Sequence, residues 1–152
     1  MKKFELTSEF VTFLGKTLFR IKALVSFGDV AEGELGGFIE RENNLDQSGD
    51  AWVYGNAQVY GDAQVYGNAQ VSGNAWVQNC RDYSATSCFG SENRTTTFFR
   101  TKDGGISVRC GCFYGTLREF REKVKERHGD SRLAKEYLML ADLMEFRLSK
   151  DE

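Results

Sequence analysis

The chain has 152 residues and carries 20 Lys and Arg against 22 Asp and Glu, a formal net charge of −2 at pH 7. This balance lacks the basic surface typical of duplex-DNA binders, so we expect no binding to duplex DNA. No apolar run approaches about 18 residues and no signal-peptide pattern follows Met1. We therefore expect a folded protein of the cytoplasm that neither spans a membrane nor is secreted.

The first 34 residues predict an N-terminal β cap. Residues 4–27 are rich in large apolar side chains, and the alternation of apolar and basic residues in 18–24 predicts a strand. Glycines at 28, 33, 36 and 37 mark a loop that leads into Phe38 and Ile39. Stepping back by six from Ala51 reaches Leu45 and Ile39, so we expect a degenerate first repeat to begin near Leu35.

Residues 48–77 contain a six-residue unit repeated five times without a gap, from Ser48-Gly-Asp-Ala-Trp-Val53 to Ser72-Gly-Asn-Ala-Trp-Val77. Val is β-branched and favours a pleated, half-buried surface, whereas Gly with Asn or Asp tolerates the backbone angles of a corner. Short strands alternating with tight corners predict a left-handed parallel β-helix over residues 35–79.

The repeat leaves the size of one coil open. If three hexads make a coil, residues eighteen apart stack, so that Val53 lies on Val71 and Gln58 on Trp76. If two hexads make a flatter coil, Tyr54 stacks directly on Tyr66. We favour three hexads, and an antiparallel meander is disfavoured because only four residues separate its turns.

Residues 80–152 predict a C-terminal α+β unit, which gives the chain a mainly β fold overall. Residues 79–93 are polar and are interpreted as a connection, whereas 95–101 and 106–113 flank a Gly-containing turn and predict a β-hairpin. Thr116 and Glu119 form a capping box before an amphipathic helix that Gly129 ends. Ser131 begins a second helix, and the unit is expected to plug the open end of the β-helix.

Several motifs together resemble a family of uncharacterised phage and prophage hexapeptide-repeat proteins, whose members are often labelled polymer-forming cytoskeletal proteins. Beside the hexads, they are Gly33-Glu-Leu-Gly-Gly-Phe-Ile-Glu40, Asn44-Leu45, Thr95-Thr-Thr-Phe-Phe99, Cys110-Gly-Cys-Phe113, Gly115-Thr-Leu117 and His128-Gly-Asp130. The resemblance implies a phage or prophage origin, a bacterial host cytoplasm and a β-helix. It implies no reaction.

The residues give little support to catalysis. Hexapeptide-repeat acyltransferases need a general base beside the coil wall, but the single His, His128, lies outside the repeats. Pairing His128 with Cys110 or Cys112 as a nucleophilic site is a weaker alternative. Cys80 and Cys88 complete four thiols whose spacing is unusual for zinc, so we expect free thiols, no metal and no cofactor.

We therefore expect a non-catalytic accessory binding protein with a counter-defence role, which binds a host defence protein or sequesters a nucleotide signal in a dimer or trimer. Acyl transfer and purely structural self-assembly are the alternatives. Aromatic side chains on the repeat wall are predicted to be exposed and to form the interface: Trp52, Tyr54, Tyr60, Tyr66 and Trp76. Hydroxyl and guanidinium groups on the hairpin are predicted to hold phosphates: Arg94, Thr95, Thr96, Arg100 and Arg109.

Overall fold

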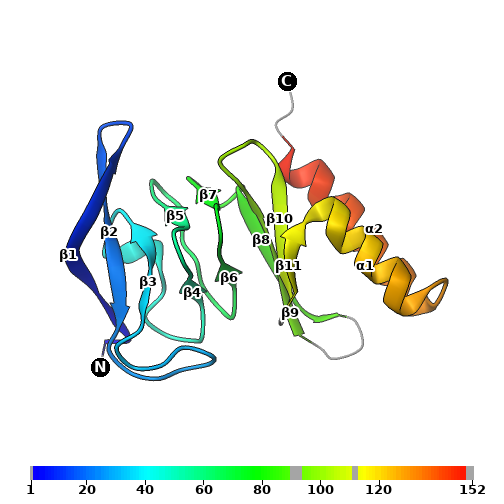
Figure 1. Cartoon of the computed structure of the whole chain (residues 1–152), viewed down its shortest axis with the longest axis horizontal. Helices are drawn as coiled ribbons and strands as arrows, with labels where there is room; N and C mark the ends of the chain where they lie inside the picture. The colour runs from blue at the N-terminus through cyan, green and yellow to red at the C-terminus, as the bar shows by residue number, and fades with distance from the viewer. Residues whose placement is uncertain (1, 90–93, 111–112, 150–152) are drawn as a thin grey trace.

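The protein is mainly β, with two helices at the C-terminus, as the sequence predicts. The computed structural model describes residues 2–89, 94–110 and 113–149, and only the backbone of 87–89 and 94. Figure 1 shows an N-terminal hairpin, the short repeat strands, an antiparallel sheet and a helix pair following one another along the molecule. The repeat strands therefore lie between two larger β elements.

The N-terminal hairpin forms the edge of a five-stranded sheet in the order β1-β2-β3-β5-β7. Strands β1 (Phe4–Phe13) and β2 (Lys16–Ala23) pair antiparallel, and β3 (Leu35–Ile39) pairs antiparallel with β2. From β3 onward the pairing becomes parallel, first with β5 (Gln58–Val59) and then with β7 (Trp76–Val77). The hairpin thus continues the ladder of the repeats. Strand β2 covers most of the strand that was predicted over residues 18–24.

The repeat strands pair in the register expected for three hexads. Trp52 pairs with Gln70 and Val53 with Val71, through β4 (Trp52–Val53) and β6 (Gln70–Val71). Gln58 and Val59 pair in the same way with Trp76 and Val77. The eighteen-residue register is therefore confirmed for these pairs, and the direct stacking of Tyr54 on Tyr66 is not the arrangement found.

The first passage of the chain through these ladders, residues 38–53, departs from the prediction. Leu45 forms a parallel bridge with Val65, twenty residues later, just as Ile39 pairs with Val59. Leu45 therefore occupies a Val position of the hexad, and its predicted equivalence with Ala51 is wrong. Two additional residues lie between Leu45 and Trp52, because the register returns to eighteen at β4.

The interior of the repeat region is built from the recurring small apolar side chains. They are fully or almost fully buried and form one cluster: Ala51, Val53, Ala57, Val59, Ala63, Val65, Ala69, Val71, Ala75 and Val77. Close packing also explains the glycine pair before Phe38. A Cβ atom on Gly36 would lie 2.6 Å from the Val53 carbonyl oxygen, and one on Gly37 would lie 2.6 Å from that of Ala57.

The C-terminal unit contains a four-stranded antiparallel sheet in the order β11-β10-β9-β8. The predicted hairpin is present as β9 (Arg94–Arg100) and β10 (Ile106–Cys110), and β11 (Phe113–Thr116) follows it. The prediction of a connection over residues 79–93 is wrong, because β8 (Tyr83–Phe89) pairs with β9 along this segment. The uncharged sequence of β8 has little apolar alternation, and its pairing with β9 makes it a strand.

Two helices cover one face of this sheet. Helix α1 (Leu117–His128) begins at the predicted Thr116–Glu119 capping box and is followed by Gly129 at positive φ. Helix α2 (Arg132–Leu148) begins after Ser131, whose hydroxyl accepts a hydrogen bond from the Ala134 N–H. Among the described residues, neither helix is long and apolar enough to cross a membrane. A short 3₁₀ turn, η1 (Glu42–Asn44), follows β3 and leads to the candidate site.

Candidate functional site

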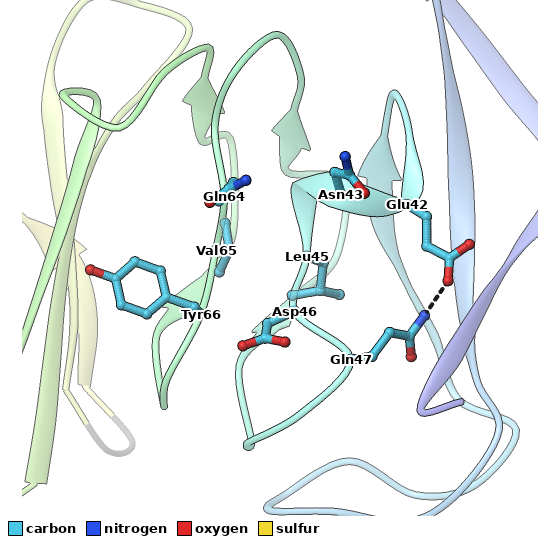
Figure 2. Close-up of a pocket in the computed structure, with 8 residues that line it drawn as sticks. All are labelled: Glu42, Asn43, Leu45, Asp46, Gln47, Gln64, Val65 and Tyr66. Atoms are coloured by element: carbon cyan, nitrogen blue, oxygen red, sulfur yellow. Dashed lines mark hydrogen bonds between the residues drawn. The ribbon is translucent and has the colours of Figure 1, made fainter. Parts of the chain in front are cut away.

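A groove of about 810 Å³ lies on the side of the repeat region that has no regular strand. Residues just after β3 and residues between β5 and β6 line it together (Figure 2). The first passage contributes Glu42, Asn43, Leu45, Asp46 and Gln47 to its lining. The second passage, residues 58–71, contributes Gln64, Val65 and Tyr66. The Leu45–Val65 bridge forms the floor of the groove. The polar side chains around it therefore extend from backbone whose position is fixed by hydrogen bonds.

Tyr66 is the aromatic side chain at one end of this groove. Its side chain is 64% exposed, and its ring makes an edge contact with Tyr83 at 6.5 Å between centroids. The Tyr83 hydroxyl is itself fixed by donating to the Gln64 carbonyl oxygen at 2.7 Å. Tyr66 therefore presents a supported ring whose remaining surface is open to a partner.

Two carboxylates give the groove its charge. The Ser48 backbone N–H donates to Asp46 Oδ1 at 3.1 Å, and this bond, with the Ser48 hydroxyl and the charge of Lys3, holds the pKa of Asp46 below its usual value despite the opposing effect of burial. Glu42 accepts a 2.9 Å hydrogen bond from Gln47 Nε2 and pairs with Lys2 at 3.4 Å. Asp46 is therefore ionised at neutral pH and disfavours an anionic ligand in the groove.

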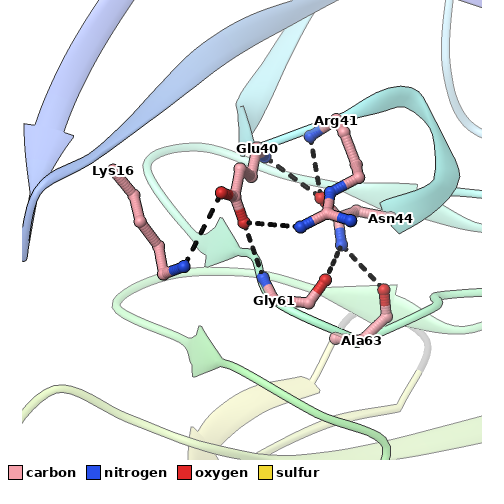
Figure 3. Close-up of polar contacts among 6 residues, drawn as sticks. All are labelled: Lys16, Glu40, Arg41, Asn44, Gly61 and Ala63. Carbon is pink, nitrogen blue, oxygen red and sulfur yellow. Dashed lines mark hydrogen bonds and ion pairs between the residues drawn. The ribbon is translucent and has the colours of Figure 1, made fainter.

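A buried amide fixes the corner from which the groove begins (Figure 3). Asn44 is 1% exposed, and its Oδ1 accepts from the backbone N–H groups of Glu40 and Arg41. Its Nδ2 donates to the carbonyl oxygens of Gly61 and Ala63 at 3.3 and 2.8 Å. All four polar positions of the amide are therefore used, two within the first passage and two to join it to the second.

The Glu40 carboxylate adds a second connection at the same corner. It accepts a 2.9 Å hydrogen bond from the Gly61 N–H and lies 3.7 Å from Lys16 and 3.5 Å from Arg41. The Gly61 bond and the two cations lower the pKa of Glu40, although desolvation opposes them. The N-terminal hairpin is thus tied to the corner by its Lys16 side chain.

The predicted exposure of the repeat aromatics is wrong for Trp52 and Tyr60, which are both buried. The N-terminal segment covers Trp52, because Phe4 and Phe27 make edge contacts with its ring at 6.4 and 5.3 Å. The tip of the β1–β2 hairpin covers Tyr60, where Phe13 lies at 5.6 Å. Intramolecular aromatic packing therefore occupies these two predicted interface residues.

The other three predicted interface residues differ in exposure. Trp76 is half-buried against Phe13 at 4.6 Å, and its Nε1 donates to Gln58 Oε1 at 3.0 Å. Tyr54 is half-buried beneath the Arg109 guanidinium, which lies 4.3 Å from its ring centroid. Tyr66 alone of the predicted set keeps most of its surface exposed.

The predicted phosphate-binding residues do not form one site. Arg109 pairs with Thr97 across the sheet and faces the repeat region, where it donates to the Ser72 hydroxyl at 3.3 Å. Arg100 lies on the helix side and donates to the Ser149 carbonyl oxygen at 3.1 Å. The two guanidinium groups are separated because side chains alternate between the two faces of a strand. The sequence alone does not show which residues of β9 and β10 share a face.

The remaining members of that set are also separated. Thr96 is fully buried and its hydroxyl lies 3.2 Å from Cys110 Sγ. Thr95 lines a smaller pocket of about 390 Å³ with Arg147 and Tyr66. The side chain of Arg94 lies outside the described residues. The predicted single phosphate site is therefore wrong for the four side chains that the structure describes.

The potentially reactive residues are dispersed. His128 stacks on Tyr137 at 5.8 Å near the end of α1 and lies outside the repeat strands. Cys80 is exposed and Cys110 is partly buried, both as free thiols. The Cys88 side chain and Cys112 lie outside the described residues, among which no three His, Cys, Asp or Glu side chains gather as metal ligands.

The groove was not predicted from the sequence, although one signal marks it. Ile39 and Leu45 keep the six-residue spacing of the repeat, whereas residues 40–47 lack its Gly-Asn-Ala motif. The loss of this motif where the six-residue spacing is kept indicates a corner that is built differently from the other corners of the repeat. A scan against protein-family models and a search of curated proteins found no match to this chain.

Proposed function

We propose that the repeat region is a short left-handed parallel β-helix. The eighteen-residue register of two ladders and the Leu45–Val65 bridge on a third line support three short sides per coil. The resemblance to hexapeptide-repeat proteins supports the left-handed sense. One end of the ladders continues into β2 and β1, and the β8–β11 sheet packs at the other end through the Thr97 hydroxyl, which accepts from the Gln70 N–H at 2.9 Å. Covered ends argue against coils stacking end to end into a fibre.

We further propose that this protein is a non-catalytic binding protein whose groove captures an extended, positively charged segment of a partner protein. The observation that carries the proposal is the exposed Tyr66 ring in a groove that also contains ionised Asp46 and the carboxylate of Glu42 (Figure 2). Lys and Arg side chains pair with carboxylates and also bind aromatic faces. Because these groups are spread along the groove, a segment of several residues fits them better than a single cation does.

The resemblance to phage and prophage proteins supports a bacterial host protein as this partner, in the cytoplasm of the host cell. Occupying the basic segment of a host defence protein is the counter-defence role that we propose. Sequestration of a nucleotide is less favoured in this groove, because its carboxylates repel phosphates and Arg100 and Arg109 lie on opposite faces of the sheet. The position of His128 at the end of α1, where it stacks on Tyr137 outside the repeat strands, argues against the acyltransferase alternative.

The proposal is tested with a fluorescein-labelled hexa-arginine peptide, measured by fluorescence anisotropy against a hexa-glutamate reference. Tyr66→Ser introduces the residue that two other hexads carry at this position, Ser48 and Ser72, so the fold should tolerate it. We expect a two- to fivefold weaker affinity from the lost cation–π contact, about 0.5–1 kcal/mol at an exposed site. Asp46→Asn should also weaken binding and reduce its dependence on salt.

Asp62→Asn is the matched control, because Asp62 is an exposed carboxylate of the repeat region that does not line the groove. It removes the same charge and should leave the affinity nearly unchanged. An equal loss in Asp46→Asn and Asp62→Asn would show general attraction to an acidic protein and contradict the proposed site. Absence of peptide binding at low salt would reject the proposal.

A further inference from the structure

The two sheets of the protein end in differently protected edge strands. In β1, Glu5 and Glu9 carry charge and the register against β2 shifts between Leu6 and Phe10, and both features hinder pairing with another strand. Strand β8 contains neither a charged residue nor a proline, and it pairs with β9 alone among the described strands. Strand β8 therefore lacks the usual protection of an edge.

The ladder between β8 and β9 shows which backbone groups of β8 are left over. The Arg100 N–H donates to the Asp82 carbonyl oxygen at 2.9 Å, just before Tyr83 pairs with Phe99. Hydrogen-bonded and non-bonded pairs alternate in an antiparallel ladder, so the pairing of Ala85 with β9 is non-bonded. The N–H and C=O groups of Ala85 consequently point away from β9, and its side chain is exposed.

A pocket of about 390 Å³ lies against β8 and is lined from both faces of the sheet. Ala85 pairs with Thr97, whose hydroxyl accepts from the Gln70 N–H, so Ala85 is on the face toward the repeat region. Ser84 pairs with Phe98, which belongs to the core beneath the helices, and is therefore on the other face. A pocket that both residues line extends across the edge of β8.

The pocket has one side wall from the repeat region and one from α2. The repeat region contributes Tyr66, Gly67 and Asn68, and α2 contributes Arg147. The Tyr66 ring makes its edge contact with Tyr83, and Figure 2 shows this ring extending away from the floor of the groove. The space between the two walls therefore follows a single edge strand, which is a shape that an extended peptide fills.

Arg147 is the one charged residue among those that line this pocket. Its side chain is exposed and makes no hydrogen bond or ion pair within the described part of the chain. Arg121 on the neighbouring helix differs, because Asp142 and Glu145 both pair with it at 2.7 Å. A guanidinium that no carboxylate neutralises favours an anionic group, and a carboxylate can accept two parallel hydrogen bonds from it.

We propose that an extended segment of a partner protein pairs with β8 as an additional strand and places the carboxylate of an Asp or Glu side chain against Arg147. In this mode of recognition, main-chain hydrogen bonds supply affinity and the side chains of alternate residues supply specificity. The N–H and C=O groups of Ala85 provide the central hydrogen bonds. Arg147 selects an acidic side chain on the face of the added strand toward the helices.

This site is separate from the groove proposed above for a basic segment, because Tyr66 is the one residue that both linings share. The charges of the two sites also favour different ligands. Asp46 and Glu42 attract a basic segment to the groove, whereas the Arg147 guanidinium repels such a segment from the pocket at β8. A single protein partner with a basic and an acidic segment could occupy both sites.

The test uses ¹⁵N–¹H NMR spectra of the full chain, titrated with the acetylated and amidated peptide Thr-Val-Thr-Glu-Thr-Val-Thr. Its residues favour strands, and the order of its side chains is the same in both directions, so either strand orientation is tested. We expect the Ala85 amide to shift and to become protected from exchange with solvent. No shift at Ala85 with about 3 mM peptide, enough to detect a Kd of about 1 mM, overturns the proposal. An Ala85 amide that is already protected without peptide also overturns it, because another strand, such as that of a second copy, then occupies the edge.

Arg147→Gln tests the carboxylate contact. It should weaken the affinity about two- to fivefold, the range expected for an exposed ion pair, and a peptide with Gln in place of Glu should bind the wild type equally weakly. Arg127→Gln is the matched control, since Arg127 is an exposed arginine of α1 that does not line the pocket. Equal losses in the two variants, or equal affinities of the wild type for the Glu and Gln peptides, overturn the proposal.

Ala85→Pro tests the backbone pairing, because it removes an outward N–H without removing a hydrogen bond to β9. It should weaken binding at least about tenfold. A peptide that is N-methylated at every residue tests the same point without altering the protein and should bind as weakly. Undiminished binding of the methylated peptide overturns the proposal. Neither Arg147 nor Ala85 lines the groove, so the affinity for hexa-arginine should not fall in either variant, and the two proposals can fail separately.

Discussion

The first and second passages through the repeat ladders use the same pairing but different means of stabilisation. The second passage, residues 58–71, is built from hexad residues, with Val59, Val65 and Val71 inside. The first passage, residues 38–53, depends on side chains that the paired positions of the second passage lack, above all Asn44 and Trp52. The comparison teaches that repeated residues set the register, whereas unrepeated ones determine where the array begins.

The two additional residues of the first passage show how such a beginning is stabilised. Lys3 is 4% exposed, and its ammonium donates to the carbonyl oxygens of Ser48, Gly49 and Ala51, the last at 2.8 Å. The side chain of Gln47 exchanges hydrogen bonds with the backbone of Phe4. Burial lowers the pKa of Lys3, which makes these carbonyl contacts necessary compensation for desolvation. The N-terminal segment therefore closes a corner that hexad residues leave unsatisfied.

Of the substitutions that test this comparison, Trp52→Gln should cause the largest loss in the free energy of unfolding. Gln occupies the paired position of the second passage, Gln70, so Trp52→Gln makes the first passage resemble the second. We expect a loss of about 3 kcal/mol in the free energy of unfolding, because Trp52 is fully buried against Phe4 and Phe27. Urea denaturation followed by circular dichroism measures this difference.

Trp76→Gln is the matched control for that substitution. Trp76 is only half-buried, so its replacement should lower the free energy of unfolding by about 1 kcal/mol or less, as is usual outside the buried core. Equal losses for Trp52→Gln and Trp76→Gln would contradict the assignment of Trp52 to the interior.

Asn44→Ala should have the next largest effect. The paired residue of the second passage is Gln64, whose side chain is exposed, whereas Asn44 makes four hydrogen bonds in a buried corner. We expect a loss of about 2–3 kcal/mol, since each buried group left unsatisfied costs on the order of 1 kcal/mol. Equilibrium unfolding in urea measures it, with Gln64→Ala as a control that should stay within about 0.5 kcal/mol of wild type. A loss in Gln64→Ala as large as that in Asn44→Ala would contradict this comparison.

The same contrast explains what the sequence could predict. The hexads have a fixed period, so the pairs Trp52–Gln70 and Gln58–Trp76 follow once three hexads are taken for each coil. The capping box at Thr116 also follows from local chemistry, because its partner Glu119 is three residues away. Both features depend on short-range spacing.

Features that depend on contacts between distant segments were mispredicted. Trp52 was expected on the surface because nothing in its hexad shows that Phe4 and Phe27 cover it. Strand β8 was interpreted as a connection, since only its pairing with β9 makes it a strand. The groove likewise depends on the two-residue change of register near Asp46, which appears only when Leu45 is paired with Val65.

Glu40→Gln should produce the smallest effect, visible as a change in pH dependence. The pKa of Glu40 is lowered in the folded protein, chiefly by the Gly61 N–H, so its contribution to stability is complete above the ordinary value of 4.5. It is lost as the pH falls from there through the lowered folded pKa, because the unfolded state takes up the proton first. As the pH falls below 4.5, the wild type should lose more stability than Glu40→Gln, by less than about 1 kcal/mol. Urea denaturation across this range measures the difference, and Glu122→Gln, at an exposed glutamate of α1, should follow the wild type. Parallel pH profiles for the wild type and Glu40→Gln would show that this carboxylate does not stabilise the first corner, leaving the connection to Asn44 alone.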